Sequence, residues 1–187
     1  MKYSIKNKQT VFDDHYKMTK AEVTYETFSG GIINTKRLAF ERGNSVAILL
    51  VEKDTNSVLL TKQFRYPTCK NNDGWILEIP AGSLEENENP KECIEREVME
   101  ELGYSIKDPK LITEFYTSPG ASTEKISLFY AEVTSKQKTG NGGGMKNEHE
   151  DIQLVKVPIH ELDEKISEIK DAKTLIAFQF LKLRKLP

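Results

Sequence analysis

The chain has 187 residues, of which 37% are hydrophobic and 30% charged, and its formal net charge of −2 corresponds to a pI near 6.0. These values describe one globular domain with room for an additional arm, and they exclude a disordered or fibrous chain. A nucleic-acid-binding protein would carry a basic excess that this composition lacks, so we expect no nucleic-acid partner.

Cys69 and Cys93 are the two cysteines, and we predict that both are free thiols because they form no C-x-x-C spacing. The N-terminal residues contain no apolar stretch of signal-peptide length, and no run approaches the roughly 18 apolar residues of a membrane span. We therefore expect a cytoplasmic protein without a membrane partner.

The first predicted elements form a β arm. Two β-prone stretches, KMTKAEVTYETF and INTKRLAFE, flank the turn signal Gly30-Gly31 and predict a hairpin between residues 17 and 41. The sequence is accordingly divided into an N-terminal arm, residues 1–43, and a main domain, residues 44–187.

The main domain opens with two apolar runs, SVAILLV and SVLLTKQF, on either side of Lys53–Asn56. They predict a second hairpin at the centre of a sheet. WILEIPAG follows as a short strand that ends at Pro80, and Trp75 at its start is expected to pack in the core, although it has the ring to stack on a base.

Residues Pro90–Gly103 form the clearest predicted helix, with proline at its start and glycine at its C-terminal cap. LITEFYTS and ISLFYAEV return to strand character. The polar, glycine-rich segment 135–151 is either disordered or a functional loop, and its acidic end favours function. The strand IQLVKV then leads into helical patterns at Ile159–Ile169 and Ala172–Lys185.

The segment GSLEENENPKECIEREVMEELGY matches the pattern G-x5-E-x7-R-E-U-x-E-E-x-G-U, in which U is a bulky apolar residue. A chance match is expected at the order of 10⁻⁶ per chain of this composition. Tyr104 departs mildly from the last position, where an aliphatic residue is usual, but its ring can still pack there. The matching residues are Gly82, Glu88, Arg96, Glu97, Val98, Glu100, Glu101 and Gly103.

This spacing places three carboxylates on one stripe of the predicted helix. At about 100° per residue, Glu101 lies about 40° from Glu97, and Glu100 lies about 60° to its other side. Such carboxylates repel one another unless a hard cation neutralises them, which predicts a Mg²⁺ site. A solvated acidic face is the simplest alternative, but it leaves the register of the other matching residues unexplained. The adjoining apolar stripe, which would dock the helix, consists of Ile94, Val98 and Leu102.

In these residues the chain resembles the Nudix hydrolases. The resemblance implies an α/β fold, the Nudix α/β/α sandwich with a mixed central sheet and an N-terminal β arm. It also implies that a water molecule attacks a pyrophosphate bridge with the help of Mg²⁺, for which Mn²⁺ is a substitute.

The resemblance also assigns roles by position. Glu100 would be a metal ligand or a supporting acid, and Glu148 is the candidate general base. Arg96 and Glu88 would hold the loop–helix–loop in shape. The implied metal ligands are the backbone carbonyl of Ala81 and the carboxylates of Glu97, Glu101 and Glu150, the last delivered by the glycine-rich loop.

The flanking sequence favours one branch of the family. Pro119 in FYTSPGASTE, together with KQFR and DAKT, resembles the ADP-ribose and nucleotide-sugar pyrophosphatases. ERGNSVAILL and GGGMKNEHEDI look most like bacterial GDP-mannose pyrophosphatases, and this likeness runs from about Tyr16 to the end of the chain. The seven-residue spacing before Arg96 fits ADP-ribose pyrophosphatases equally well, so both substrates stay open.

The branch implies contacts to a nucleotide sugar. Arg65 and Glu124 would contact the diphosphate and sugar portions. Tyr16 would stack on the base from a neighbouring subunit, because relatives form homodimers with exchanged arms. The residues that would supply charge for phosphates or substrate oxygens are Lys36, Arg37 and Lys173. The histidines without a partner at metal-ligand spacing, which we expect to be non-catalytic, are His15, His149 and His160.

We therefore expect hydrolysis of a nucleoside diphosphate sugar of the GDP-mannose type to a nucleoside monophosphate and a sugar phosphate. The alternative within the family is ADP-ribose, which gives AMP and ribose 5-phosphate. A non-catalytic ligand sensor is disfavoured because the carboxylates are intact, and sanitation of damaged triphosphates is disfavoured by the arm and the SPG motif.

Overall fold

The computed structural model describes residues 1–183, which belong to two compact units. The first unit consists of Met1–Asn44 and Tyr116–Lys125, and the second of Ser45–Phe115 and Ile126–Pro187. The first unit therefore includes a loop from the middle of the chain in addition to the predicted arm. The predicted helix end at Lys185 lies outside the described residues.

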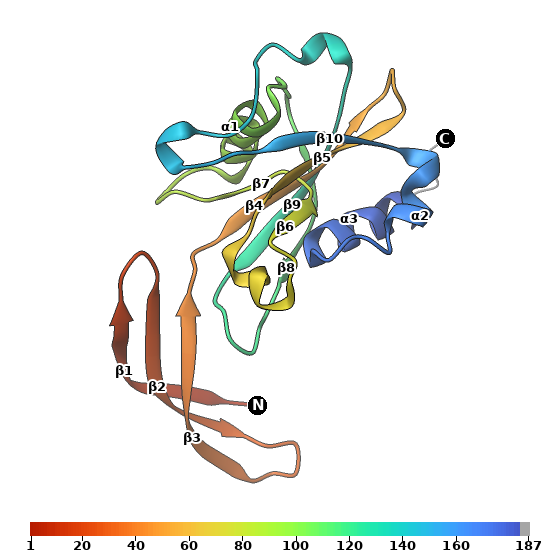
Figure 1. Ribbon diagram of the computed structural model, residues 1–187. Coiled ribbons are helices and arrows are strands. Elements are labelled where there is room, and N and C mark those ends of the chain that lie inside the picture. Colours follow the sequence, from red (N-terminus) through yellow and green to blue (C-terminus); the bar gives the residue numbers. More distant parts are fainter. Residues whose placement is uncertain (184–187) are drawn as a thin grey trace. The chain divides into compact units, whose positions relative to one another are not determined.

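The first unit is an antiparallel sheet in the order β1-β2-β3 (Figure 1). Its strands are Tyr3–Asp13, Lys17–Glu26 and Ile32–Glu41. The predicted β2–β3 hairpin is present, whereas β1 was not predicted because its side chains are all exposed and carry no apolar periodicity. The loop of this unit is attached at Phe40, whose N–H donates to the Ala121 carbonyl at 2.8 Å.

The second unit contains a seven-stranded mixed sheet with the path β10-β5-β4-β9-β8, to which β6 adds beside β5 and β7 beside β4. Strand β4 runs parallel to β9 and antiparallel to β5 and β7, so the sheet is mixed as expected. The strands are β4 Ser45–Glu52, β5 Ser57–Phe64, β6 Trp75–Glu78, β7 Ala81–Ser83, β8 Lys110–Tyr116, β9 Lys125–Val133 and β10 Gln153–Pro158.

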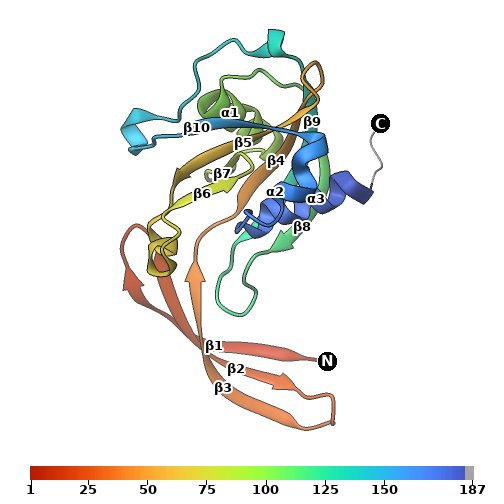
Figure 2. The ribbon, with the colours of Figure 1, turned by 45° about the vertical axis from the view of Figure 1, so that its right-hand side comes forward.

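Helices cover both faces of this sheet, and α1 lies opposite α2 and α3 (Figures 1 and 2). Every residue of β4 is buried, because its alternate side chains enter two different core clusters. Ile48 and Leu50 belong to the α1 cluster, while Leu49 belongs to the α3 cluster with Phe178. This arrangement is the expected α/β/α sandwich. The helices are α1 Pro90–Leu102, α2 Leu162–Lys165 and α3 Ala172–Leu183.

Helix α1 begins and ends where the sequence predicted. The Asn89 side chain caps its N-terminus by accepting from the N–H of Lys91 at 2.9 Å, and Gly103 adopts the left-handed conformation at its C-terminus, with φ 76°. The helix predicted over Ile159–Ile169 is much shorter, because a 3₁₀ turn precedes α2 and the chain leaves the helix after Lys165. Short 3₁₀ helices occupy Tyr66–Asn71, Ser135–Gln137, Lys146–Glu148 and Ile159–Glu161.

Both cysteines are free thiols, as predicted. Among the helices of residues 1–183, none combines the length and the apolar character needed to cross a membrane.

Candidate active site

Helix α1 docks through the predicted apolar stripe and leaves its acidic stripe at the site. Ile94, Val98 and Leu102 are fully buried in the cluster that contains Ile48 of β4. Glu97 and Glu100 are partly buried on the same helix, while Glu101 is only 2% exposed. The glutamates predicted to bind metal therefore lie at the edge of the core and not on a solvated face.

Gly82 makes room for one of these carboxylates. A Cβ atom at this position would lie 2.0 Å from Cδ of Glu97, far inside van der Waals contact. The glycine of the sequence pattern thus leaves room for the Glu97 side chain over β7, and a larger residue would displace that carboxylate from its present position.

Arg96 binds the acidic residues around it. Its Nε and Nη2 donate to Glu88 at 3.2 and 3.3 Å, and its Nη1 donates to Glu97 at 2.8 Å and to Glu100 at 3.0 Å. The predicted Arg96–Glu88 contact is therefore present, and it fixes the loop before α1 to the helix.

Burial and acidic neighbours disfavour the ionised form of two carboxyl groups of α1. Burial raises the pKa of Glu97 to about 7; Arg96 opposes this shift, while Glu100 and Glu150 add to it. Burial raises the pKa of Glu101 well above its usual range, and Glu97, Glu78 and Glu150 raise it further. A hard cation would relieve this repulsion, so the donor chemistry fits Mg²⁺.

No three acidic, histidine or cysteine side chains within residues 1–183 are assembled as a metal cage. The predicted ligand carboxylates stand apart because each has a hydrogen-bond partner of its own. Glu97 turns toward Arg96, and Glu150 Oε2 accepts from the N–H of Met145 at 3.0 Å. Ala81 lies beside the carboxylates, because its N–H donates to Glu101 at 3.2 Å.

The glycine-rich segment is an ordered loop attached to the C-terminal end of α1. The N–H groups of Thr139 and Gly140 both donate to the Gly103 carbonyl at 2.9 Å. The N–H of Gly143 donates to the backbone carbonyl of Glu101 at 2.9 Å, and the N–H of Gly144 donates to the backbone carbonyl of Glu100 at 3.0 Å. Two residues of the acidic stripe are therefore tied through their backbones to the loop that carries Glu148 and Glu150.

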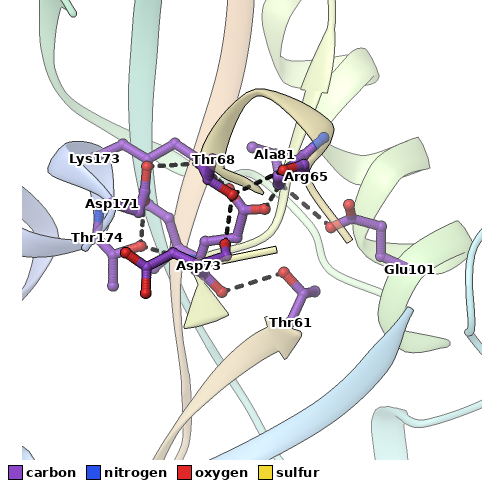
Figure 3. Close-up of polar contacts among 11 residues, drawn as sticks. Thr61, Arg65, Thr68, Asp73, Ala81, Glu101, Asp171, Lys173 and Thr174 are labelled. Atoms are coloured by element: carbon purple, nitrogen blue, oxygen red, sulfur yellow. Dashed lines mark hydrogen bonds and ion pairs between the residues drawn. The ribbon is translucent and has the colours of Figure 1, made fainter. Parts of the chain in front are cut away.

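Two of the predicted substrate residues belong to the second unit, Arg65 and Lys173, which are labelled in Figure 3. Both pair with the buried Glu78. Glu78 was not singled out from the sequence. An acid in the otherwise apolar strand WILEIP was the signal that pointed to it.

The other predicted substrate residues belong to the first unit and have partners there. The Tyr16 ring packs edge to face with the Phe40 ring, with 5.2 Å between the ring centroids. The Arg42 guanidinium lies 4.8 Å from the centroid of the Tyr16 ring. Lys36 pairs with Glu22 at 3.8 Å, Arg37 donates to Thr35 at 2.7 Å, and Glu124 accepts from Thr117 at 3.4 Å.

Trp75 is not a core residue, so the prediction for it was wrong. Its side chain is 56% exposed, because β6 adds at the end of β5, where Trp75 pairs with the exposed Phe64. It lines a cleft of about 430 Å³ with Lys62, Asp151 and Gln153. The cleft adjoins the loop that carries Glu150.

The sequence profile of the NUDIX domain matches residues 41–178. The chain is 37% identical to a GDP-mannose pyrophosphatase of Cronobacter sakazakii over 95% of its own length and 94% of the relative. It is also 37% identical to a GDP-mannose pyrophosphatase of Enterobacter sp., over 94% of the chain and 93% of the relative. The chain belongs to the Nudix family.

A solved structure titled ADP compounds hydrolase shares the fold, with a TM-score of 0.72 over 99% of this chain and 97% of that chain. Its sequence identity is 18%, so this likeness concerns the fold alone.

Proposed function

We propose that this Nudix hydrolase cuts the pyrophosphate bridge of a nucleoside diphosphate sugar of the GDP-mannose type, releasing a nucleoside monophosphate and a sugar 1-phosphate. The observation that carries the proposal is the identity of 37% to GDP-mannose pyrophosphatases over nearly the full chain. The intact carboxylates of α1 support a catalytic protein over a ligand sensor.

Glu97, Glu101, Glu150 and the carbonyl of Ala81 would hold Mg²⁺, with Mn²⁺ as a substitute. When bound, the metal lowers the pKa of a coordinated water and neutralises charge on the departing phosphate. The raised pKa values of Glu97 and Glu101 support this assignment, because a bound cation would favour the ionised form that burial disfavours.

The chain's own residues would position the substrate and handle the proton. Arg65, with its partly exposed guanidinium, would bind a diphosphate oxygen. Glu148 is exposed on the loop and would accept the proton of the attacking water, while Glu100 would support the metal ligands. Lys36, Arg37 and Glu124 would contribute to substrate binding from the first unit, and Lys173 from α3.

We further propose that residues 1–43 act as an arm that pairs with a second copy of the chain and carries Tyr16 to the base. Several large apolar side chains of its sheet are exposed, which supports association. They include Tyr3, Ile5, Phe12, Ile32 and Leu38. The free thiols suit the reducing cytoplasm, where we place the protein.

The test is kcat/KM with Mg²⁺ across GDP-mannose, ADP-ribose, ADP-glucose, 8-oxo-dGTP and a diadenosine polyphosphate, with products separated by chromatography. We expect GDP-mannose first, ADP-ribose next, and the last two far behind, because they lack the sugar-bearing end that helps to orient the reacting phosphorus. A tenfold preference for the triphosphate would contradict the proposal. ADP-ribose is the second candidate, because the seven-residue spacing before Arg96 fits it equally well.

A further inference from the structure

Glu78, the last residue of β6, joins two cations that come from distant parts of the sequence. Its side chain is 4% exposed. Its Oε1 accepts a hydrogen bond from Nε of Arg65 at 2.7 Å, and its Oε2 forms an ion pair with Nζ of Lys173. One carboxylate thereby connects the residue after β5 with the first turn of α3.

The first turn of α3 is itself fixed to β6. Asp171 caps the helix, with Oδ2 accepting from the N–H of Thr174 at 2.9 Å, and its Oδ1 pairs with Lys173 at 3.0 Å. The Thr174 hydroxyl accepts from the N–H of Ile79 at 2.8 Å. The helix is therefore anchored at the residue that follows Glu78, and Figure 3 shows Asp171, Lys173 and Thr174 together in this network.

Arg65 and Lys173 differ in what they can offer to a substrate. The Lys173 side chain is 10% exposed, and its ammonium already faces Glu78 and Asp171. The Arg65 side chain is 40% exposed, and within residues 1–183 its guanidinium donates a hydrogen bond through Nε alone. A guanidinium carries five N–H donors in a fixed plane, so the terminal nitrogens of Arg65 remain for an anion.

Arg65 is linked through Glu78 to the segment that reaches the predicted metal ligands. Nε of Arg65 donates to Glu78, and Ala81, farther along the same segment, donates its N–H to Glu101 at 3.2 Å. Burial lowers the pKa of Arg65, but Glu78, Glu101 and Asp171 together raise it overall. Once Nε is held, the guanidinium plane cannot turn freely.

We propose that Glu78 is a positioning residue that orients Arg65 toward the substrate diphosphate. This inference rests on the proposed function, because it requires a diphosphate substrate. Orientation before binding lowers the entropic cost of placing the reacting phosphorus. Removing one partner of a buried ion pair also destabilises a fold, so the test has to separate positioning from loss of structure.

The test is a double-mutant cycle on kcat/KM with Glu78→Gln, Arg65→Ala and the double variant. We expect each single variant to lose about 10- to 100-fold, in the range of a lost charge-assisted contact. The double variant should lie within about threefold of Arg65→Ala, because Glu78 then has nothing to position. If the two losses multiply, Glu78 acts independently of Arg65 and the proposal is overturned.

A matched control separates positioning from general loss of structure. Glu52 is also fully buried and pairs with a lysine, Lys156, but it lies outside the candidate site. Glu52→Gln should lower Tm and leave kcat/KM within about twofold of the wild type, since it breaks the ion pair with Lys156 and weakens the hydrogen bonds from Thr55 and Tyr104 outside the candidate site. An equal loss of activity at Glu52 and Glu78 would assign the effect to folding and contradict the proposal.

Glu78→Asp provides a second route if Glu78→Gln does not fold, because it keeps the charge but shortens the reach toward Arg65. Its loss of kcat/KM should disappear in the Arg65→Ala background, whereas a loss that persists there would overturn the role of Glu78. If GDP-mannose is not hydrolysed, the proposed function fails on the wild type alone. The cycle is then run on the best substrate of the panel or, if none is hydrolysed, on the Kd for GDP-mannose with Mg²⁺.

Discussion

Glu101 combines two properties that conflict in a stable core. It is 2% exposed, and burial together with its acidic neighbours raises its pKa well above the usual range. A carboxyl whose pKa is raised in the folded state stabilises the fold while it is protonated and loses that contribution as pH rises through the folded pKa. Ionisation of Glu101 therefore costs the folded state stability, and a bound cation would offset that cost.

This conflict leads to a prediction for Glu101→Gln. The variant should lower kcat by at least about a hundredfold, because a metal ligand loses its charge. It should also raise Tm in metal-free buffer, because glutamine carries no charge that burial and acidic neighbours would disfavour. Steady-state kinetics and thermal unfolding with and without Mg²⁺ provide the measurements. A variant with near-normal turnover would rule out Glu101 as a ligand, and a lowered Tm would mean that the charge is already neutralised within the chain.

At the scale of single residues, the sequence predicted which residues lie together but not how deeply they are buried. The spacing of Glu97, Glu100 and Glu101 followed from helix geometry alone. The burial of Glu78 could not be predicted, because it depends on Lys173, which lies 95 residues away. Trp75 was misplaced because an apolar strand pattern does not reveal that one end of the strand lies at an exposed edge.

At the scale of elements, the junction between α1 and the glycine-rich loop requires glycines, because their lack of a side chain lets the two backbones approach closely. A Cβ atom at Gly142 would lie 2.6 Å from the carbonyl carbon of Leu102, and one at Gly103 would lie 2.2 Å from the Gly140 carbonyl oxygen. These glycines permit close backbone approach between the helix and the loop.

We predict that Gly142→Ala loosens this junction and lowers both Tm and activity. Gly30→Ala is the matched control, because Gly30 also has positive φ, 82° against 68°, but has open space around its Cβ position. Backbone strain should cost both variants about 1 kcal/mol, whereas the clash affects Gly142→Ala alone. Urea unfolding and kcat/KM would be compared. Equal effects at the two positions would show that φ alone requires glycine at residue 142.

Elements with a strong local pattern were predicted well from the sequence. Helix α1 carries its own cap, proline and terminal glycine, and the β2–β3 hairpin carries Gly30-Gly31. Strand β1 and the short α2 lacked such signals, because their conformations depend on pairing with β2 and on packing under the sheet.

At the scale of the whole second unit, Glu52 connects three segments of the fold. It accepts hydrogen bonds from Tyr104 and Thr55, both at 2.5 Å, and pairs with Lys156 of β10 at 2.5 Å. Burial raises the pKa of Glu52, but Lys156, Thr55 and Tyr104 outweigh it and lower the pKa overall. Tyr104, the mild departure from the family pattern, thus gains a polar partner in the core.

This network should make stability depend on acid pH. A carboxyl with a lowered folded pKa stabilises the fold above its unfolded pKa, near 4.5, and loses that contribution as pH falls through the folded value. The free energy of unfolding of the wild type should therefore fall more steeply below about pH 4.5 than that of Glu52→Gln. Urea unfolding from pH 7 to pH 3 would measure both slopes, and parallel curves would count against the network.

The proposed pairing of two chains predicts that a charge in place of an exposed apolar side chain of the arm weakens association. Phe12 is 58% exposed on β1, and burying it in a dimer would favour association by roughly 1.5–3 kcal/mol. Phe12→Asp should therefore shift the molar mass from dimer toward monomer by light scattering, while Lys6→Asp, at another exposed position of β1, serves as the charge control. An unchanged dimer in Phe12→Asp would mean that this part of the arm does not contribute to the interface.

Because Trp75 is the single tryptophan of the chain and half of its ring is exposed, the protein carries its own optical reporter beside the loop of Glu150. Its emission should be red-shifted and readily quenched by acrylamide, as expected for an indole in contact with water. A nucleotide sugar added to the inactive Glu101→Gln variant should change that emission if the ligand enters the cleft or the loop moves, and the titration would give Kd without any label. Emission at the short wavelengths of a buried indole would place Trp75 against another surface in solution.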